Sequence, residues 1–134
     1  MGVIVNANPE RDLATFLISL PEKLAFGDED TATVIDLSYT PDFEQYNDGI
    51  QLDRESLIRH ARPARKNVVG IRTDVHDVLV SGDRFAARYT IRAEMRKGAI
   101  LVNEVYMFGH YAADGRIRRI DSITRTISPD PPAP

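Results

Sequence analysis

Hydrophobic and polar residues alternate along several long runs between Val68 and Arg125. In the clearest run every second residue is apolar: Phe85, Ala87, Tyr89, Ile91, Ala93 and Met95. A period of two is typical of a β-strand with one buried face. Turn sequences punctuate these runs at Ser81-Gly82-Asp83, Arg96-Lys97-Gly98 and Asp114-Gly115. The pattern predicts three long antiparallel strands joined in a meander.

The residues before this region predict three short amphipathic helices. The first begins with Asn8 as its cap and Pro9 in its first turn. Pro21 interrupts its apolar stripe, so we expect a kink or break near Leu20 and an end at Gly27. The stripe consists of Leu13, Phe16, Leu17, Leu20 and Leu24.

A second helix is expected after Asp28-Glu29-Asp30, ending before Pro41, and a third is expected from the cap Asp53 to Pro63. Between them, 43–46 is expected to be extended and Asn47-Asp48-Gly49 to form a turn. The predicted buried positions of the two helices are Val34, Ile35, Leu37, Leu57, Ile58 and Ala61.

The helices are the only elements left to cover the apolar face of the strands. We therefore expect an α+β fold in which three N-terminal helices pack on a strongly curved, mainly antiparallel sheet and leave a concave interior for a ligand. A chain of 134 residues fits one domain, placed at 1–127. Segment 128–134 contains four prolines and is expected to be a disordered tail.

Composition narrows the function classes. The chain has no cysteine, which removes disulfides, thiolate nucleophiles and zinc-thiolate sites. A net charge of -3 disfavours a general nucleic-acid binder. No apolar run approaches a membrane span and no leader pattern opens the chain, so a cytoplasmic protein without membrane contact is expected.

The order of helix, helix, short strand with an Asp-Gly turn, capped helix and meander resembles the nuclear transport factor 2-like superfamily, particularly its SnoaL-like branch. The resemblance rests on residues 39–43 leading to Asn47-Asp48-Gly49, on 78–89 and on 113–117. It implies a cone-shaped fold with a pocket between helices and sheet, commonly dimeric. The superfamily includes ketosteroid isomerases, polyketide cyclases, limonene epoxide hydrolases, dehydratases and non-catalytic binding domains, among which fold alone does not choose.

The enzyme patterns of that superfamily map poorly onto this chain. The two isomerase aspartates would fall at Tyr46 and near Met107, and the arginine and aspartate of the epoxide hydrolases at Tyr89 and Ile91. Tyr46 and Asp48 resemble the tyrosine and asparagine with which the hydrolases position a water. The cyclases place a carboxylate on the last strand, where this chain offers Asp121 or, one register away, Ser122.

Four residues are the candidate catalytic groups: Tyr46, Asp48, His60 and Asp121. Tyr46 and Asp48 share one side of an extended segment and are expected at the pocket mouth; in the alternative, Asp48 serves the Asp-Gly turn and Tyr46 simply packs. His60 borders the buried stripe of its helix and is either an acid-base group in the cavity or a surface residue. Asp121 is either catalytic or paired across strands with an arginine such as Arg92.

No metal or cofactor is expected. His76 lies between Asp74 and Asp77, but adjacent strand positions face opposite sides unless a bulge intervenes. The basic run from Arg59 to Lys66 lacks the interleaved aromatic residues of a single-strand binder, so we read it as a solvated helix end and expect no nucleic-acid partner.

Alternation places Val105, Met107, Gly109 and Tyr111 toward the pocket and Tyr106 and Phe108 outside. An exposed aromatic pair indicates a homodimer through the outer sheet face. The expected ligand is an apolar small molecule of polyketide, steroid or terpenoid type, held by Phe16, Leu20, Tyr39, Phe43, Tyr89, Met107 and Tyr111. An inward carboxylate or histidine with a perturbed pKa favours a cofactor-independent acid-base enzyme, whereas a phenolic and apolar interior favours a binding or dimerisation domain.

Overall fold

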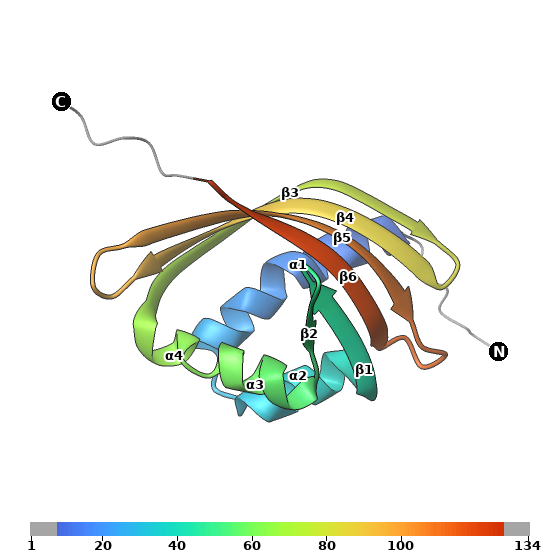
Figure 1. The fold of residues 1–134 in the computed structure, drawn as a ribbon, viewed down its shortest axis with the longest axis horizontal. Helices are drawn as coiled ribbons and strands as arrows, with labels where there is room; N and C mark the ends of the chain where they lie inside the picture. The colour runs from blue at the N-terminus through green and yellow to red at the C-terminus, as the bar shows by residue number, and fades with distance from the viewer. Residues whose placement is uncertain (1–7, 128–134) are drawn as a thin grey trace.

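The structure is a computed structural model that describes residues 8–127. The expected proline-rich tail, 128–134, lies outside the described residues. Helices α1, α2 and α3 lie on one side of a six-stranded sheet, and the other face of the sheet is open in Figure 1. The α+β class with N-terminal helices on a mainly antiparallel sheet is confirmed.

Helix α1 (Pro9–Phe26) begins and ends where the sequence predicts. The Asn8 side chain accepts a hydrogen bond from the backbone N–H of Arg11 at 2.9 Å, and the N–H of Gly27 donates to the carbonyl of Lys23. The helix runs through Pro21 without the predicted break. Proline removes one backbone donor, but buried Leu17 before it and buried Ala25 after it hold both halves of the helix in the core.

The next two helices are α2 (Thr31–Ser38) and α3 (Arg54–Ala61), capped by the side chains of Asp30 and Asp53. Val34 and Ile35 are buried as expected. Leu37 is 67% exposed, so its predicted burial is wrong: it lies in the last turn of α2, beside an open groove described below. A one-turn helix that the sequence analysis missed, α4 (Ala64–Asn67), leads into the long strands.

The three predicted turns join four long strands rather than three. These are β3 (Val68–Ser81), β4 (Arg84–Met95), β5 (Ile100–Tyr111) and β6 (Ile117–Ile127), preceded by β1 (Tyr39–Asn47) and β2 (Ile50–Leu52). The sheet order is β2-β1-β6-β5-β4-β3, and β1 runs parallel to β6 while the other neighbours are antiparallel. The pairing of β1 with β6 brings the first strand of the chain beside the last.

Two polar contacts fix α1 across the sheet. Near its start, the Glu10 carboxylate accepts a hydrogen bond from the backbone N–H of Val80 on edge strand β3 at 2.8 Å. Near its end, the guanidinium of Arg65 donates to the carbonyls of Leu24 and Glu29. Arg65 is therefore a structural clamp, which corrects its reading as part of a solvated helix end.

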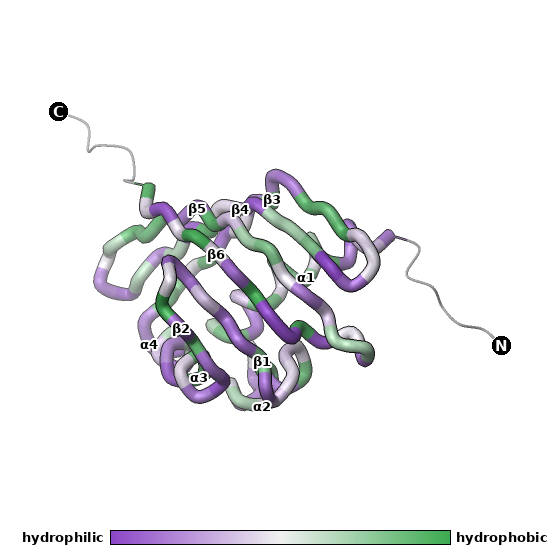
Figure 2. Tube along the Cα trace, turned by 45° about the vertical axis from the view of Figure 1, so that its right-hand side comes forward, coloured by the Kyte–Doolittle hydropathy of each residue, from purple (hydrophilic) through white to green (hydrophobic). Residues whose placement is uncertain are grey.

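The two faces of the sheet differ as the alternation predicts, and Figure 2 shows hydrophobic and hydrophilic residues following one another along the strands. On β5, Val105 and Met107 are buried, whereas Tyr106 and Phe108 are 43% and 70% exposed. The inner face and the helices share one core, which includes Leu13, Leu17, Ile35, Tyr39, Phe43, Phe85, Met107, Ile117 and Ile120.

Gly109 on the inner face leaves room for an aromatic ring. It pairs with Phe85 across β4 and β5, and a Cβ atom at Gly109 would overlap the Phe85 ring. Phe85 in turn packs against Tyr111, with ring centroids 4.7 Å apart. The glycine thus sets where both rings lie.

We expect Gly109→Ala to lower the free energy of unfolding by about 1–3 kcal/mol, because overpacking displaces a buried ring. Chemical denaturation measures this. Phe85→Leu in the Gly109→Ala background should restore part of the loss, because the smaller side chain leaves space for the new methyl group. Additive losses in the double variant would contradict the assigned steric cause.

Candidate functional site

An internal cavity of about 50 Å³ lies between α1 and the inner face of the sheet. Five of the seven predicted wall residues surround it: Phe16, Leu20, Tyr39, Tyr89 and Met107. The others in the wall are Leu13, Leu17, Pro21, Phe85, Ile117 and Ile120. The structure thus brings most of the predicted wall together, while the role of these residues in binding stays a prediction.

Tyr39 and Tyr89 are the two residues of this cavity wall whose side chains carry a hydroxyl group. Burial raises the pKa of Tyr39, with a smaller contribution from nearby Tyr89, and burial raises the pKa of Tyr89 to about 12. Both phenols therefore stay protonated near neutral pH and can donate a hydrogen bond. Among the described residues, no carboxylate or histidine lines the cavity.

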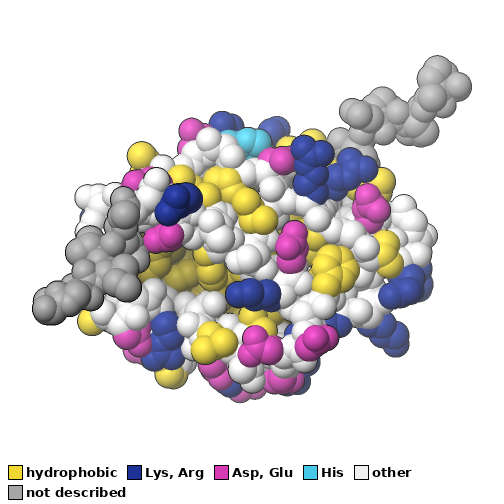
Figure 3. Space-filling model, turned by 180° about the vertical axis from the view of Figure 1, so that it is seen from behind, with side chains coloured by type: hydrophobic (Ala, Val, Ile, Leu, Met, Phe, Trp, Pro, Cys, Tyr) yellow, Lys and Arg dark blue, Asp and Glu magenta, His cyan; other side chains and the backbone are white. Residues whose placement is uncertain are grey.

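A larger groove of about 750 Å³ opens beside the cavity. It lies between the start of α1, the end of α2 and the β3–β4 and β5–β6 turns. Figure 3 shows a hollow with hydrophobic side chains on this side of the molecule. Leu13, Phe16 and Ile117 line both spaces, so one layer of apolar side chains separates groove from cavity.

Of the two remaining predicted wall residues, Tyr111 lines the groove rather than the cavity. Phe43 is buried and packs against Tyr39, with ring centroids 4.8 Å apart, behind the cavity wall. Burial raises the pKa of Tyr111, and the negative charge of Asp12 raises it further. The Tyr111 backbone N–H donates to the carbonyl of Asp83 at 2.7 Å.

Tyr46 and Asp121 lie side by side, but on the open face of the sheet. They are partners in the β1–β6 register, and Arg119 forms two hydrogen bonds with the Asp121 carboxylate at 2.8 and 3.1 Å. The same guanidinium lies 5.1 Å from the centroid of the Tyr46 ring. The placement of Tyr46 at the pocket mouth is therefore wrong, and Arg119, not Arg92, is the ion-pair partner of Asp121.

The physical reason is the strand register. Asn47 and Ser122 point to the inner face, where the Asn47 side-chain oxygen accepts hydrogen bonds from the hydroxyls of Ser122 and Thr124 at 2.8 and 2.9 Å. Their immediate neighbours Tyr46 and Asp121 must then point outward. Asn47 was not among the residues predicted from the sequence, and Ser122 was predicted only as the alternative register to Asp121.

Asp48 serves the turn. Its backbone adopts a left-handed conformation with φ of 54°, and its carboxylate accepts a hydrogen bond from the Thr124 N–H at 3.0 Å. His60 is exposed on α3 and lines neither space, so its cavity reading is wrong and the surface reading holds. His76 sits at a register irregularity of β3, and its ring lies 2.7 Å from the Thr90 hydroxyl.

A third, polar cleft of about 320 Å³ adjoins the groove, because Asp83 and Tyr111 line both. Its other lining residues are Asp42, Glu44, His110, Arg118 and Arg119. The sequence analysis did not single out Asp12 or Asp83. Only their positions in the sequence could have drawn attention to them: Asp12 precedes Leu13 of the apolar stripe, and Asp83 ends a predicted turn.

Within residues 8–127, no helix is long and apolar enough to cross a lipid bilayer.

Comparison with known proteins identifies the family. The SnoaL-like domain family matches residues 23–120, and the chain belongs to this family. An uncharacterized protein of Schizosaccharomyces pombe is 31% identical over 91 residues, covering 66% of this chain and 67% of that protein.

Solved structures share the fold. An NTF2-like protein of unknown function from Exiguobacterium has a TM-score of 0.67 at 13% identity, covering 84% of this chain and 97% of that one. A SnoaL-like polyketide cyclase from Jannaschia, so named without proof of activity, has a TM-score of 0.62 at 14% identity, covering 92% and 91%. At these identities the likeness concerns the fold alone.

The outer-face position of Asp121 makes a pH-dependent prediction. Hydrogen bonds and charge from Arg119 lower the pKa of Asp121. A carboxyl whose pKa is lowered on folding stabilises the protein above its unfolded pKa, near 3.9, and that contribution is lost as the pH falls through the folded pKa. Asp121→Asn should therefore reduce the loss of stability on acidification, measured by denaturation from neutral to acidic pH.

Arg119→Gln is the matched variant, because it removes the partner and should also shrink this part of the pH dependence. Neither variant should alter ligand binding at the groove. An unchanged pH profile in Asp121→Asn would contradict the assigned ion pair.

Proposed function

We propose that this SnoaL-like protein binds an apolar small molecule, whose body occupies the groove and whose inner end reaches the internal cavity. The observation that carries the proposal is the shared wall of Leu13, Phe16 and Ile117 between the two spaces. Polyketide, steroid and terpenoid skeletons are the ligand classes to test first.

The volumes of the two spaces support a ligand that lies mainly in the groove and only partly in the cavity. A cavity of about 50 Å³ holds little more than the roughly 30 Å³ that one water occupies in the liquid. The groove, at about 750 Å³, lies within the range of roughly 300–1,000 Å³ typical of small-molecule sites. The ligand must therefore sit mainly in the groove, and deeper entry requires side chains of the shared wall to move.

The chemistry of the cavity favours binding over acid-base catalysis there. Tyr39 and Tyr89 are protonated donors in an otherwise apolar wall, which suits a carbonyl or hydroxyl oxygen at the inner end of the ligand. Such donors orient a ligand without a cofactor. A group that could take up a proton near neutral pH is not among the described cavity residues.

A cofactor-independent acid-base enzyme is the second candidate, and one observation favours it. The Asp12 carboxylate acts electrostatically on the Tyr111 phenol, and both line the groove. A carboxylate beside a phenol supplies a base and a hydrogen-bond donor at the same ligand. The polyketide cyclase name of a structural neighbour is consistent with such chemistry.

We also propose that a second copy of the chain covers the outer sheet face. Four exposed side chains cluster there: Leu79, Tyr106, Phe108 and Ile123. Tyr106 is directly opposite Ile123 in the β5–β6 register. Nearby charges are internally balanced, as in the Arg88–Asp77 and Arg119–Asp121 pairs, so a like surface would meet no net repulsion.

The groove is tested by filling it. Ala113→Trp places a large side chain in the β5–β6 turn that lines the groove, and we expect it to weaken binding of the neutral probe 1-naphthalenemethanol at least 10-fold, measured by calorimetry. Lys97→Trp, in the distant β4–β5 turn, is the matched control. Equal binding by both variants would place the site elsewhere.

The phenols are tested in the same assay. Tyr89→Phe should weaken the binding of an oxygen-bearing ligand that reaches the cavity, and it should change the binding of the deoxygenated analogue little. If Asp12→Asn instead abolishes turnover of a substrate while ligand affinity is retained, the enzyme is the better description.

Self-association is tested by charge on the outer face. Light scattering at micromolar concentration should show a dimer, and Tyr106→Asp with Phe108→Asp should give a monomer, because buried unpaired carboxylates oppose assembly. Leu101→Asp, an exposed apolar position on the same strand but off this face, is the control. A monomeric wild-type protein would contradict the dimer proposal.

A further inference from the structure

The groove carries charge of one sign only. Asp12 and Asp83 are its charged side chains, and none of its described lining residues is a lysine, arginine or histidine. Neither carboxylate forms a salt bridge or accepts a side-chain hydrogen bond within residues 8–127. Asp36, Asp77, Asp114 and Asp121, by contrast, each have an arginine partner.

The rest of the groove is mostly apolar and includes aromatic surface. Leu13, Val80 and Ile117 contribute aliphatic wall, and Phe16 and Tyr111 contribute rings. Tyr111 interacts with both acidic residues. The negative charge of Asp12 raises the pKa of the Tyr111 phenol, and the Tyr111 backbone N–H donates a hydrogen bond to the carbonyl of Asp83. Aromatic faces attract ammonium groups, so the rings and the carboxylates favour the same sign of charge.

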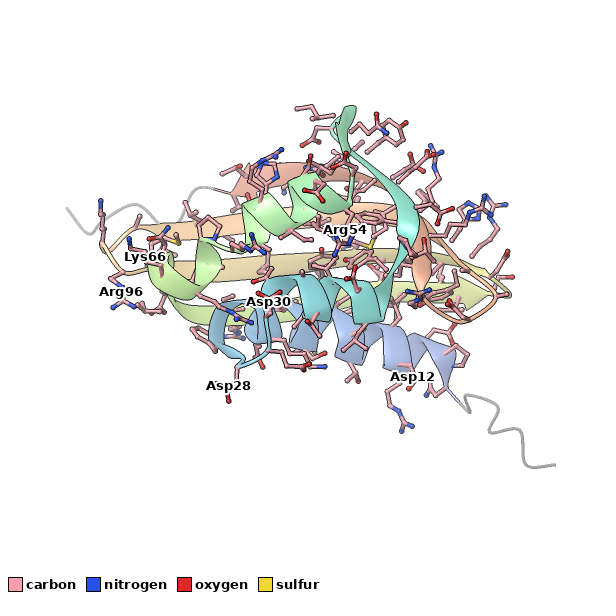
Figure 4. All side chains as sticks on the ribbon, turned by 90° about the horizontal axis from the view of Figure 1, so that it is seen from below. Asp12, Asp28, Asp30, Arg54, Lys66 and Arg96 are labelled. Carbon is pink, nitrogen blue, oxygen red and sulfur yellow. The ribbon has the colours of Figure 1, made fainter. Side chains whose placement is uncertain are left out.

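Charges of both signs lie around the groove and elsewhere on the molecule. In Figure 4, Asp12 lies at one end of the helical layer, and Lys66 and Arg96 lie toward the opposite end together with Asp28 and Asp30. Arg118, Arg119 and His110 line the neighbouring cleft together with Asp42, Glu44 and Asp83. The groove differs from this cleft, because Asp12 and Asp83 are the only charged side chains among its described lining residues.

Each acid also has a local reason for its position. Asp12 lies in the first turn of α1, where a negative charge is favourable, and Asp83 lies in the β3–β4 turn. These reasons explain an acid at each site. They do not explain why an apolar groove between them lacks a basic side chain.

We propose that the groove selects an amphiphilic organic cation, with its apolar skeleton against Leu13, Phe16 and Ile117 and its ammonium group near Asp12 and Asp83. This inference rests on the proposed function, because it names the charge of the ligand that the groove takes. A neutral ligand of equal shape binds more weakly, and an anionic one is repelled.

Three probes with one ring system separate the charges: 1-naphthylmethylamine, 1-naphthalenemethanol and 1-naphthoate near neutral pH. Calorimetry with the wild type should give the order amine, alcohol, carboxylate from tightest to weakest. Asp12→Asn and Asp83→Asn should each weaken the binding of the amine by roughly 2- to 5-fold, as expected for solvent-exposed ion pairs. Both variants should leave the affinity for the alcohol unchanged. The amine preference should shrink as salt rises to about 0.5 M.

Glu22→Gln is the matched control, because it removes the same charge from α1 some 15 Å further along the helix, at about 1.5 Å per residue. It should leave the amine preference intact. Equal affinity for amine and alcohol, tightest binding of the carboxylate, or an amine preference that survives both aspartate variants would overturn this inference while leaving the groove as a ligand site. Absence of binding by all three probes would overturn the inference and the proposed function together.

Discussion

The position of α1 across the inner face of the sheet is the constraint on which the candidate site depends. Leu13 and Phe16 on this helix belong to the wall of both the cavity and the groove. Contacts near both ends fix the helix: Glu10 binds the backbone of Val80 on edge strand β3, and Arg65 binds the carbonyls of Leu24 and Glu29. A shift of α1 would change both spaces at once, because protein interiors pack closely.

Strand alternation then assigns each side chain to one of two environments. The inner face of the sheet holds the apolar core with buried Tyr39 and partly buried Tyr89, and the outer face holds paired charges around exposed apolar side chains. Tyr46 and Asp121 show how strict the assignment is. Tyr46 is one position away from the inward residue Asn47, and Asp121 is one position away from the inward residue Ser122. That single step places Tyr46 and Asp121 on the open face instead of the inner face.

Much of the fold follows from local sequence signals. Asn8, Asp30 and Asp53 cap helices as expected, and the alternation of β5 correctly separates Met107 from Phe108. The parallel pairing of β1 with β6 could not be read from the sequence, because the two strands are remote in the chain and share no turn. Without that register, the facing of Tyr46 and Asp121 remained undetermined. The groove was missed for a related reason, since it forms where α1 meets two turns distant in sequence.

We propose that a ligand enters beside α1 and that the outer face of the sheet serves assembly. The most direct test is nuclear magnetic resonance of the labelled protein during titration with 1-naphthalenemethanol. The account predicts that signals of Leu13, Phe16 and Ile117 shift with ligand, whereas those of Phe108 and Ile123 respond to protein concentration alone. Ligand-dependent shifts centred on Phe108 and Ile123, with Leu13 and Ile117 unchanged, would contradict it.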